Sequence, residues 1–297
     1  MPVRLKRRFL FATALLAAGL GLPPNQASAQ ERPKKLVVGL LPGESAPTVM
    51  RLNEPLRAYL EKRLGMPVEL AVGADYAATG EALRFGRLDI AFLGPVTYIL
   101  RFRSAKLEPF ARPSHAVVGP TFTAVVIVPA DSKAETLADL KGGEVAFGDP
   151  ASTSGTWVPR YQLLKAGLVS GRDYTLRVLG AHDAVALAVA NHRVAAGGLS
   201  QPVYARLLKE GKIDPKATRV LEVSPPIPEY MWTFRQGIDP AFKEEVREAF
   251  IHVDDPAALK VFNAEAFIPC VDSDVDRVRG WINAIQAANP DAVPPPQ

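Results

Sequence analysis

The sequence has almost no cysteine, no very long apolar run and, after its first eight residues, no excess of one charge. Each of these absences excludes a class of site or partner. Cys270 is the only cysteine among 297 residues, which excludes an internal disulfide, a CxxC redox pair and a multi-cysteine metal site. Four of the 35 lysines and arginines lie in the first eight positions, and the remaining 31 match the 31 aspartates and glutamates. This neutral body offers no basic face for phosphate backbones, so we expect no nucleic-acid partner. With 48% hydrophobic residues, the chain can bury the core of one or two ordinary domains.

Residues 1–29 have the pattern of a signal peptide. Basic residues precede an apolar run from Phe9 to Leu22, which is shorter than the roughly 20 residues that cross a bilayer. Ala27-Ser28-Ala29 supplies small residues before the expected cleavage site, so we predict cleavage after Ala29 and a mature protein in the periplasm. The Arg7-Arg8 pair leaves open whether export uses the general or the twin-arginine route.

After residue 35 the sequence alternates between strand-like and helix-like segments. Short apolar runs at residues 36–41, 68–72 and 88–93 predict buried strands of a parallel sheet. Apolar periodicity predicts helices at residues 56–64, 75–85 and 96–103, the first of them capped by Asn53. This succession predicts an α/β lobe with helices on both faces of its sheet.

A second α/β series lies between residues 120 and 230. Residues 116–128 are too long for one ordinary strand, so we expect the chain to cross to a second sheet near Gly119-Pro120 and to return near Met231. Strands at 144–147, 175–179 and 195–199 alternate with helices at 153–166, 183–191 and 203–209. The fold class is therefore α/β, with two lobes joined by a two-segment hinge around a cleft. Lobe 1 comprises residues 30–119 and 231–289, lobe 2 comprises residues 120–230, and residues 290–297 form a loose tail.

The segment Asp149 to Thr156 has the most specific local pattern in the sequence. Ser152, Thr153 and Ser154 follow a predicted strand and precede a predicted helix, where backbone amides lack partners and the helix dipole is positive. Gly155 lets the backbone come close to a ligand. One hydroxyl could simply cap the helix, but three in succession favour an oxyanion site.

Two more loops are expected to face the same cleft. They contain Asp75-Tyr76 and the segment Gly94 to Tyr98, and each follows a strand of the first predicted sheet. Ligands in open α/β sheets bind at the carboxyl ends of strands.

At this point the sequence resembles a known family. The stretches Val145–Gly155, Ala74-Asp75-Tyr76, Gly86–Pro95 and Gly180–Asp183 are similar to those of the periplasmic phosphate/phosphite/phosphonate-binding proteins of ABC importers. The resemblance implies a two-lobed type II periplasmic binding protein that closes on its anion and works with an inner-membrane ABC permease. It further implies that Ser152, Thr153 and Ser154 hold the phosphorus oxygens, and that Tyr76 and His182 are the pocket tyrosine and histidine.

The sequence departs from members of the family that bind aminoalkylphosphonates. Residues 196–202 contain no carboxylate for a ligand ammonium group, Glu229 is the one nearby candidate, and Phe122 replaces a tyrosine. A buried ammonium without a carboxylate would be strongly destabilised. We therefore expect phosphite, phosphate or methylphosphonate in preference to an aminophosphonate. Related binding proteins that sense arsenite rely on a pocket cysteine. Because Cys270 lies away from these loops, arsenite is disfavoured as the ligand, whereas arsenate stays open.

The remaining candidates each have a simpler structural explanation. Asp149 either shapes its turn or accepts a proton from a P–OH group. Glu44 and Ser45 could close the pocket, although loop glutamates are usually solvated. Thr97 and Tyr98 could be a cap and a core aromatic, and His182 could be an ordinary residue at a helix start. We expect Trp157 and Trp232 to pack in the interior, and His115, His192 and His252 to lie at the surface without partners at metal-ligand spacing.

A sensor and a hydrolase are the two alternatives to an import function. A periplasmic sensor that feeds a histidine kinase would use the same closed form as its signal, and sequence alone barely separates it from an importer. A secreted hydrolase could use Ser154, His182 and Asp183, but the G-x-S-x-G elbow is missing and adjacent histidine and aspartate do not readily aim at each other. We therefore predict a monomeric binding protein that is not an enzyme and needs no metal or organic cofactor.

Overall fold

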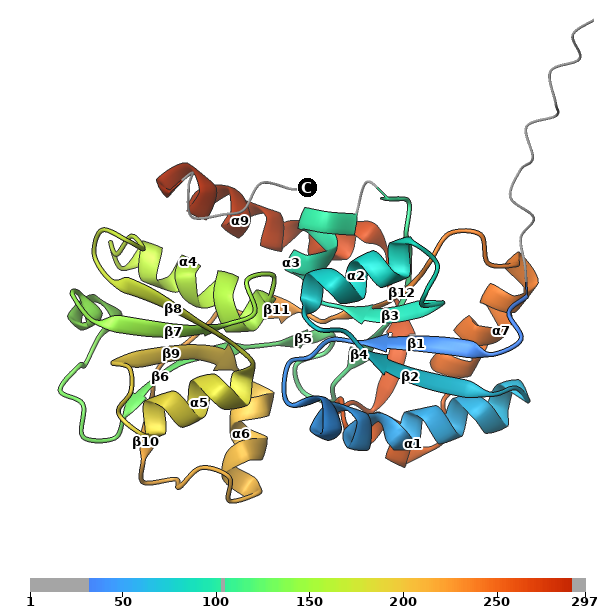
Figure 1. The fold of residues 1–297 in the computed structure, drawn as a ribbon, viewed down its shortest axis with the longest axis horizontal. Helices are drawn as coiled ribbons and strands as arrows, with labels where there is room; N and C mark the ends of the chain where they lie inside the picture. The colour runs from blue at the N-terminus through green and yellow to red at the C-terminus, as the bar shows by residue number, and fades with distance from the viewer. Residues whose placement is uncertain (1–31, 103–104, 290–297) are drawn as a thin grey trace, which may run out of the picture.

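The computed structural model describes residues 32–102 and 105–289. Two larger β-sheets, with a two-stranded ribbon between them, organise these residues (Figure 1). The predicted signal peptide and the predicted C-terminal tail lie outside the described residues.

The first sheet has the strand order β13-β4-β12-β3-β1-β2. β1 runs parallel to β2 and β3, β12 runs antiparallel to β3 and β4, and β13 runs antiparallel to β4. The strands are β1 (Leu36–Leu40), β2 (Val68–Val72), β3 (Ile90–Leu93), β4 (Glu108–Ser114), β12 (Met231–Phe234) and β13 (Ala266–Pro269).

Helices cover both faces of this sheet. One face packs against α1 (Ala46–Leu64), α7 (Pro240–Ile251) and α8 (Pro256–Lys260). The other face packs against α2 (Tyr76–Arg84), the short α3 (Pro95–Thr97), the π-turn η1 (Tyr98–Phe102) and the 3₁₀ turn η5 (Asp272–Val275).

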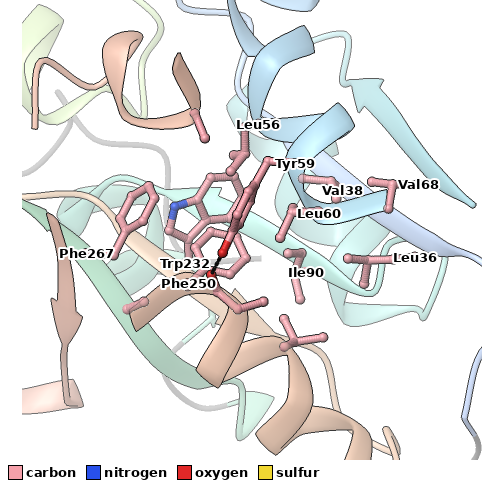
Figure 2. Packing of buried hydrophobic residues seen from close by; sticks show 14 of the residues in the cluster. Leu36, Val38, Leu56, Tyr59, Leu60, Val68, Ile90, Trp232, Phe250 and Phe267 are labelled. Atoms are coloured by element: carbon pink, nitrogen blue, oxygen red, sulfur yellow. Dashed lines mark hydrogen bonds between the residues drawn. The ribbon is translucent and has the colours of Figure 1, made fainter. Parts of the chain in front are cut away.

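The face covered by α1 and α7 has an aromatic core (Figure 2). The Trp232 and Phe250 rings lie 5.0 Å apart, and Tyr59 donates a hydrogen bond of 2.7 Å to the carbonyl of Ala249. Each large apolar side chain buried in this way stabilises the fold by about 1.5–3 kcal/mol. The result is a rigid platform beneath the loops at the strand ends.

The second sheet has the strand order β10-β6-β9-β7-β8. β7 runs parallel to β8 and β9, and β6 runs antiparallel to β9 and β10. Its strands are β6 (Ala124–Pro129), β7 (Glu144–Gly148), β8 (Thr175–Gly180), β9 (Ala196–Ser200) and β10 (Thr218–Val223). One face packs against α5 (His182–Ala190) and α6 (Gln201–Lys209), and the other packs against α4 (Val158–Lys165) and the 3₁₀ turn η3 (Leu137–Leu140).

Two short strands carry the chain between the sheets. β5 (Thr121–Phe122) and β11 (Ile227–Pro228) pair antiparallel, and the amide of Glu229 donates to the carbonyl of Pro120 at 3.0 Å. The last helix, α9 (Asp276–Ala288), lies beside this ribbon and packs on α4 through stacked Trp281 and Tyr161 rings. The sheet contents agree with crossings near residues 120 and 230, and the exact lobe boundaries remain a prediction.

Three expected elements differ in the structure. The helix predicted at residues 56–64 begins at Ala46, and Asn53 lies within it, where its amide donates to the carbonyl of Val49. Pro47 near the true start is the better signal, since proline suits the first helical turn, whereas Pro55 is tolerated inside the helix.

The apolar segment at residues 116–128 is not one strand. A turn closed by paired backbone hydrogen bonds between His115 and Gly119 precedes β5 and β6, and Gly119 has a φ of 61°. Glycine adopts this left-handed conformation without strain. The helix predicted at residues 153–166 begins as a π-turn, η4 (Thr153–Trp157), before α4.

Candidate ligand-binding site

The predicted site loops come together between the two sheets. The loops that follow β1 and β3 and the start of α2 meet the loops that follow β7 and β8, as the hydrogen bonds below show. These loops all leave the carboxyl ends of parallel strands, where α/β proteins place their ligands.

Ser152, Thr153 and Ser154 are fully buried at the start of the π-turn η4. Ser152 is the N-cap, and its hydroxyl oxygen accepts a 3.0 Å hydrogen bond from the amide of Gly155. The amides of Thr153 and Ser154 begin the helical turn, so no preceding helical carbonyl is in place to accept from them. The segment therefore presents backbone and side-chain donors together, as a bound anion requires.

The three hydroxyls have different partners. The Thr153 oxygen accepts a 3.0 Å hydrogen bond from the amide of Val96, which lies after β3 in the other sheet. The buried Ser154 hydroxyl has no partner at hydrogen-bonding geometry among the described residues, and the Tyr230 hydroxyl interacts with it electrostatically. Because a hydroxyl carries one hydrogen and two lone pairs, all three hydroxyls can still donate to a ligand.

His182 lies between a glycine of the loop after β7 and a glycine of the loop after β1. A β-carbon on Gly155 would lie 2.8 Å from its Cε1, and one on Gly43 would lie 3.5 Å from its Cδ2. The amide of Ser200 donates to His182 Nδ1 at 3.3 Å, which leaves the hydrogen on Nε2. Burial lowers the pKa of His182 to about 4, so the imidazole is a neutral donor near pH 7.

Tyr76 and Tyr230 add two phenolic hydroxyls beside Ser152. Burial raises the pKa of Tyr76 well above its usual value and raises that of Tyr230 to about 12, so both remain protonated donors. The Tyr230 ring packs on Gly94, where a β-carbon would lie 2.8 Å from its Cζ. Sequence reasoning did not select Tyr230, and its position next to Glu229 was the available signal.

Asp149 joins the two loop sets. Its Oδ2 accepts a 3.1 Å hydrogen bond from the amide of Tyr76, and its Oδ1 accepts one of 2.7 Å from the amide of Ala151. The second bond shapes the turn, which was one of the two roles considered from the sequence. A carboxylate oxygen has a second lone pair, so acceptance of a ligand proton stays a prediction.

Thr97 lies in the same cluster, and its one hydroxyl hydrogen is used within the protein. It donates to the carbonyl of Ala151 at 2.9 Å, and the side chain is fully buried. Thr97 therefore serves as a contact between the two loop sets. As expected, Tyr98 beside it is a buried aromatic.

Glu44 and Ser45 behave differently from each other. Glu44 is buried, in contrast to a solvated loop glutamate, and forms an ion pair with Arg206 of α6. Ser45 is exposed, and its hydroxyl donates to Thr48 at 2.9 Å. The structure thus places Glu44 in contact with α6 of the second sheet, and Ser45 at the N-cap of α1.

Glu229 is already paired within the protein. Its Oε1 lies 2.9 Å from Nε2 of His115, and its Oε2 accepts from the amide of Tyr230 at 3.0 Å. The His115 side chain is 12% exposed, so the prediction that it lies at the surface is wrong. The bond to Glu229 raises the pKa of His115, as charge stabilisation by a carboxylate should.

Other side chains named in the sequence analysis lie outside the donor cluster. Phe122 packs edge-on against Tyr230 at 5.7 Å, so it brings no hydroxyl to the site. Trp157 and Trp232 are both buried in the interior. His192 and His252 are exposed, as expected, and each has one acidic neighbour, Asp131 at 3.8 Å and Glu248 at 3.0 Å.

Two properties of the described residues bear on the class of site. Between residues 32 and 289, apart from 103 and 104, no three or more His, Cys, Asp or Glu side chains are grouped as a metal site would require. Within the same residues, no helix has the length and apolar character needed to cross a membrane.

The architecture has the fold of type II periplasmic binding proteins. A family model described as "ABC transporter, phosphonate, periplasmic substrate-binding protein" matches residues 38–275. The chain belongs to this family, whose members are the substrate-binding components of ABC transporters and are periplasmic.

Curated relatives carry related names. The chain is 30% identical over 232 residues to the "Phosphonates-binding periplasmic protein" of Escherichia coli (strain K12), covering 77% of this chain and 69% of the relative. It is 27% identical over 283 residues to the "Phosphate-import protein PhnD" of Mycolicibacterium smegmatis, covering 86% and 87%.

Solved structures share the fold. A binding protein component of an ABC phosphonate transporter from Pseudomonas aeruginosa superposes with a TM-score of 0.78 at 24% identity, covering 86% of this chain and 89% of that chain. PhnD1 from Prochlorococcus marinus in complex with methylphosphonate superposes with a TM-score of 0.77 at 21% identity, covering 86% and 99%.

Proposed function

We propose that this protein captures a small phosphorus oxyanion, namely phosphite, phosphate or an alkylphosphonate, and delivers it to an inner-membrane ABC permease. The observation that carries the proposal is the Ser154 hydroxyl, which is buried beside a helix start without a hydrogen-bond partner among the described residues. A buried polar group left unpaired costs about 1–3 kcal/mol, and a ligand oxygen would remove that cost.

The donors around Ser154 suit an oxyanion. Hydroxyls of Ser152, Thr153, Tyr76 and Tyr230, together with Nε2 of His182, are neutral donors at neutral pH. Neutral dipoles in a water-excluded cleft bind an anion strongly because the local dielectric constant is low. Asp149 would accept the hydrogen of a P–OH group and thereby favour a protonated oxyanion.

The carboxylates around these loops, including Asp149, which accepts from two backbone amides, already have partners within the protein and so disfavour a ligand with an ammonium group. Glu229 is bonded to His115, and Glu44 is paired with Arg206. Bringing an ammonium into the closed cleft would leave it without a free carboxylate, at a large desolvation cost. This supports phosphite, phosphate or methylphosphonate over aminoethylphosphonate.

Lobe closure is the motion we propose for capture. The lobes, 30–119 with 231–289 and 120–230, would rotate about β5 and β11 as a monomer closes on its ligand. We propose binding without catalysis, because the Asp183 carboxylate accepts from its neighbour's amide at 2.8 Å and His182 Nδ1 accepts from Ser200. Neither contact provides the aspartate–histidine pair that would activate Ser154.

Calorimetric titration tests this function directly. Phosphite, phosphate, methylphosphonate, arsenate, sulfate and aminoethylphosphonate would be titrated into the same ligand-free preparation. We expect at least one of the first three to bind more tightly than sulfate and aminoethylphosphonate. Tighter binding of aminoethylphosphonate would overturn the ligand class, and binding of none of these anions would overturn the proposed function.

A further inference from the structure

The ion pair between Glu44 and Arg206 joins segments of the two sheets. Glu44 lies in the loop between β1 and α1, whereas Arg206 lies on α6, which follows β9. Figure 1 shows the N-terminal end of α1 beside α6, between the two halves of the molecule. The pair therefore connects parts of the chain that separate when the lobes open.

The loop that carries Glu44 also rests on the candidate ligand histidine. The carbonyl of Gly43 accepts a 2.9 Å hydrogen bond from the amide of His182, and Gly43 packs close to Tyr76 Oη. Any force that holds Glu44 against α6 thus also holds this loop against the site.

The two partners differ in how much they depend on each other. Glu44 is 8% exposed, and its Oε1 has no hydrogen-bond partner among the described residues. The Arg206 side chain is 24% exposed and has a second acidic partner, Glu210, at 3.2 Å. Without Arg206, closure would bury a carboxylate that has no counter-charge, whereas Arg206 keeps a partner without Glu44.

We propose that Glu44 and Arg206 form a latch between the lobes, with Arg206 neutralising a carboxylate that closure buries, so that the pair sets how tightly the closed form holds its ligand. Both are positioning residues, since they act through the loop at Gly43. The proposal rests on the lobe closure proposed above, and it uses a bound oxyanion as one of its two readouts.

The asymmetry gives the latch a distinctive mutational signature. Arg206→Met should weaken methylphosphonate binding by about ten-fold or more, mainly through faster dissociation. Glu44→Gln should have a smaller effect because it removes the buried charge together with the contact. The double variant Glu44→Gln/Arg206→Met should bind more tightly than Arg206→Met alone.

A matched control removes an arginine whose ion pair stays within one sheet. Arg177 of β8 pairs with Glu144 of β7 at 3.3 Å, so Arg177→Met should bind like the wild type. Thermal unfolding of each variant checks that it folds, and Arg206→Gln replaces Arg206→Met if the latter does not. Equal binding by Arg206→Met and Arg177→Met, or no recovery in the double variant, would overturn the latch.

A second measurement does not depend on the ligand. Small-angle scattering should give a larger radius of gyration for ligand-free Arg206→Met than for the wild type and the double variant, since the open form becomes more populated. If the wild type binds none of the oxyanions, the proposed function fails, but the comparison of these three radii of gyration still tests the latch. Identical radii in that case would overturn it.

Discussion

Gly155 and His182 fit together because Gly155 has no side chain. A β-carbon at this position would lie 2.8 Å from Cε1 of His182 and 2.9 Å from Oγ of Ser152. These atoms belong to the donor cluster, so any added group must displace one of the ligand's expected partners.

Gly155→Ala should therefore impair both binding and stability. We expect a loss of about 1–3 kcal/mol in unfolding free energy, as for overpacking of a tight interior, and at least a comparable loss in ligand affinity. Urea unfolding and calorimetry measure the two effects. Gly280→Ala is the control, since a β-carbon in that helix meets no atom within 4 Å; equal behaviour of the two variants would contradict the packing argument.

Ser154→Ala should separate binding from stability. The hydroxyl has no partner among the described residues, so its removal leaves no protein group unpaired and should leave the ligand-free melting temperature unchanged or higher. Ligand affinity should fall by about 1–3 kcal/mol if the hydroxyl bonds to a charged oxygen. The exposed Ser273→Ala is the matched control, and unchanged affinity of Ser154→Ala would remove this hydroxyl from the site.

His182 should make the ligand-free protein sensitive to acid. Because its pKa is about 4 when folded and 6.5 ordinarily, the unfolded chain takes up the proton first as pH falls. The contribution of His182 to the free energy of unfolding is fully present above pH 6.5 and decreases by about 3 kcal/mol as the pH approaches 4.

Urea unfolding from pH 7 to 4 would reveal this dependence. The stability difference between the wild type and His182→Asn should shrink as the pH falls. His252→Asn, at a side chain that is 64% exposed, is the control for the substitution itself. A constant difference for His182→Asn would show that the buried imidazole does not titrate as proposed.

His115 should show the opposite pH dependence. Its bond to Glu229 raises its pKa, so the contribution is fully present below its ordinary pKa of 6.5 and is lost as pH rises through the folded value. Replacement by asparagine should cost about 1 kcal/mol or less at pH 6, and less at pH 9. Melting temperatures across this range provide the measurement, and a cost that grows with pH would refute the pairing.

Local sequence patterns predicted the elements that carry the site. The strand at residues 144–147, the helix start after it and the helix near residue 183 all occur, because apolar strands, hydroxyl-rich caps and glycines act over short distances. The same patterns predicted strands at residues 36–41, 68–72 and 88–93, where β1, β2 and β3 occur.

Other features depend on contacts between distant residues. β4 contains Pro109 and Pro113, which disguise a strand, yet it pairs with β12 and β13. Likewise, nothing near Glu44 indicates Arg206, and nothing near Thr153 indicates Val96. Tyr230 reaches the cluster only because the returning chain passes Gly94.

The position of β12 constrains the order in which the molecule can be built. This strand pairs with both β3 and β4, although the whole second sheet separates it from them along the chain. A nascent chain that ends before Met231 would leave the facing edges of β3 and β4 without their shared neighbour, and such edges invite aggregation. The middle of the first sheet is thus completed only after the whole second sheet has been synthesised, and β13 then adds its edge strand beside β4.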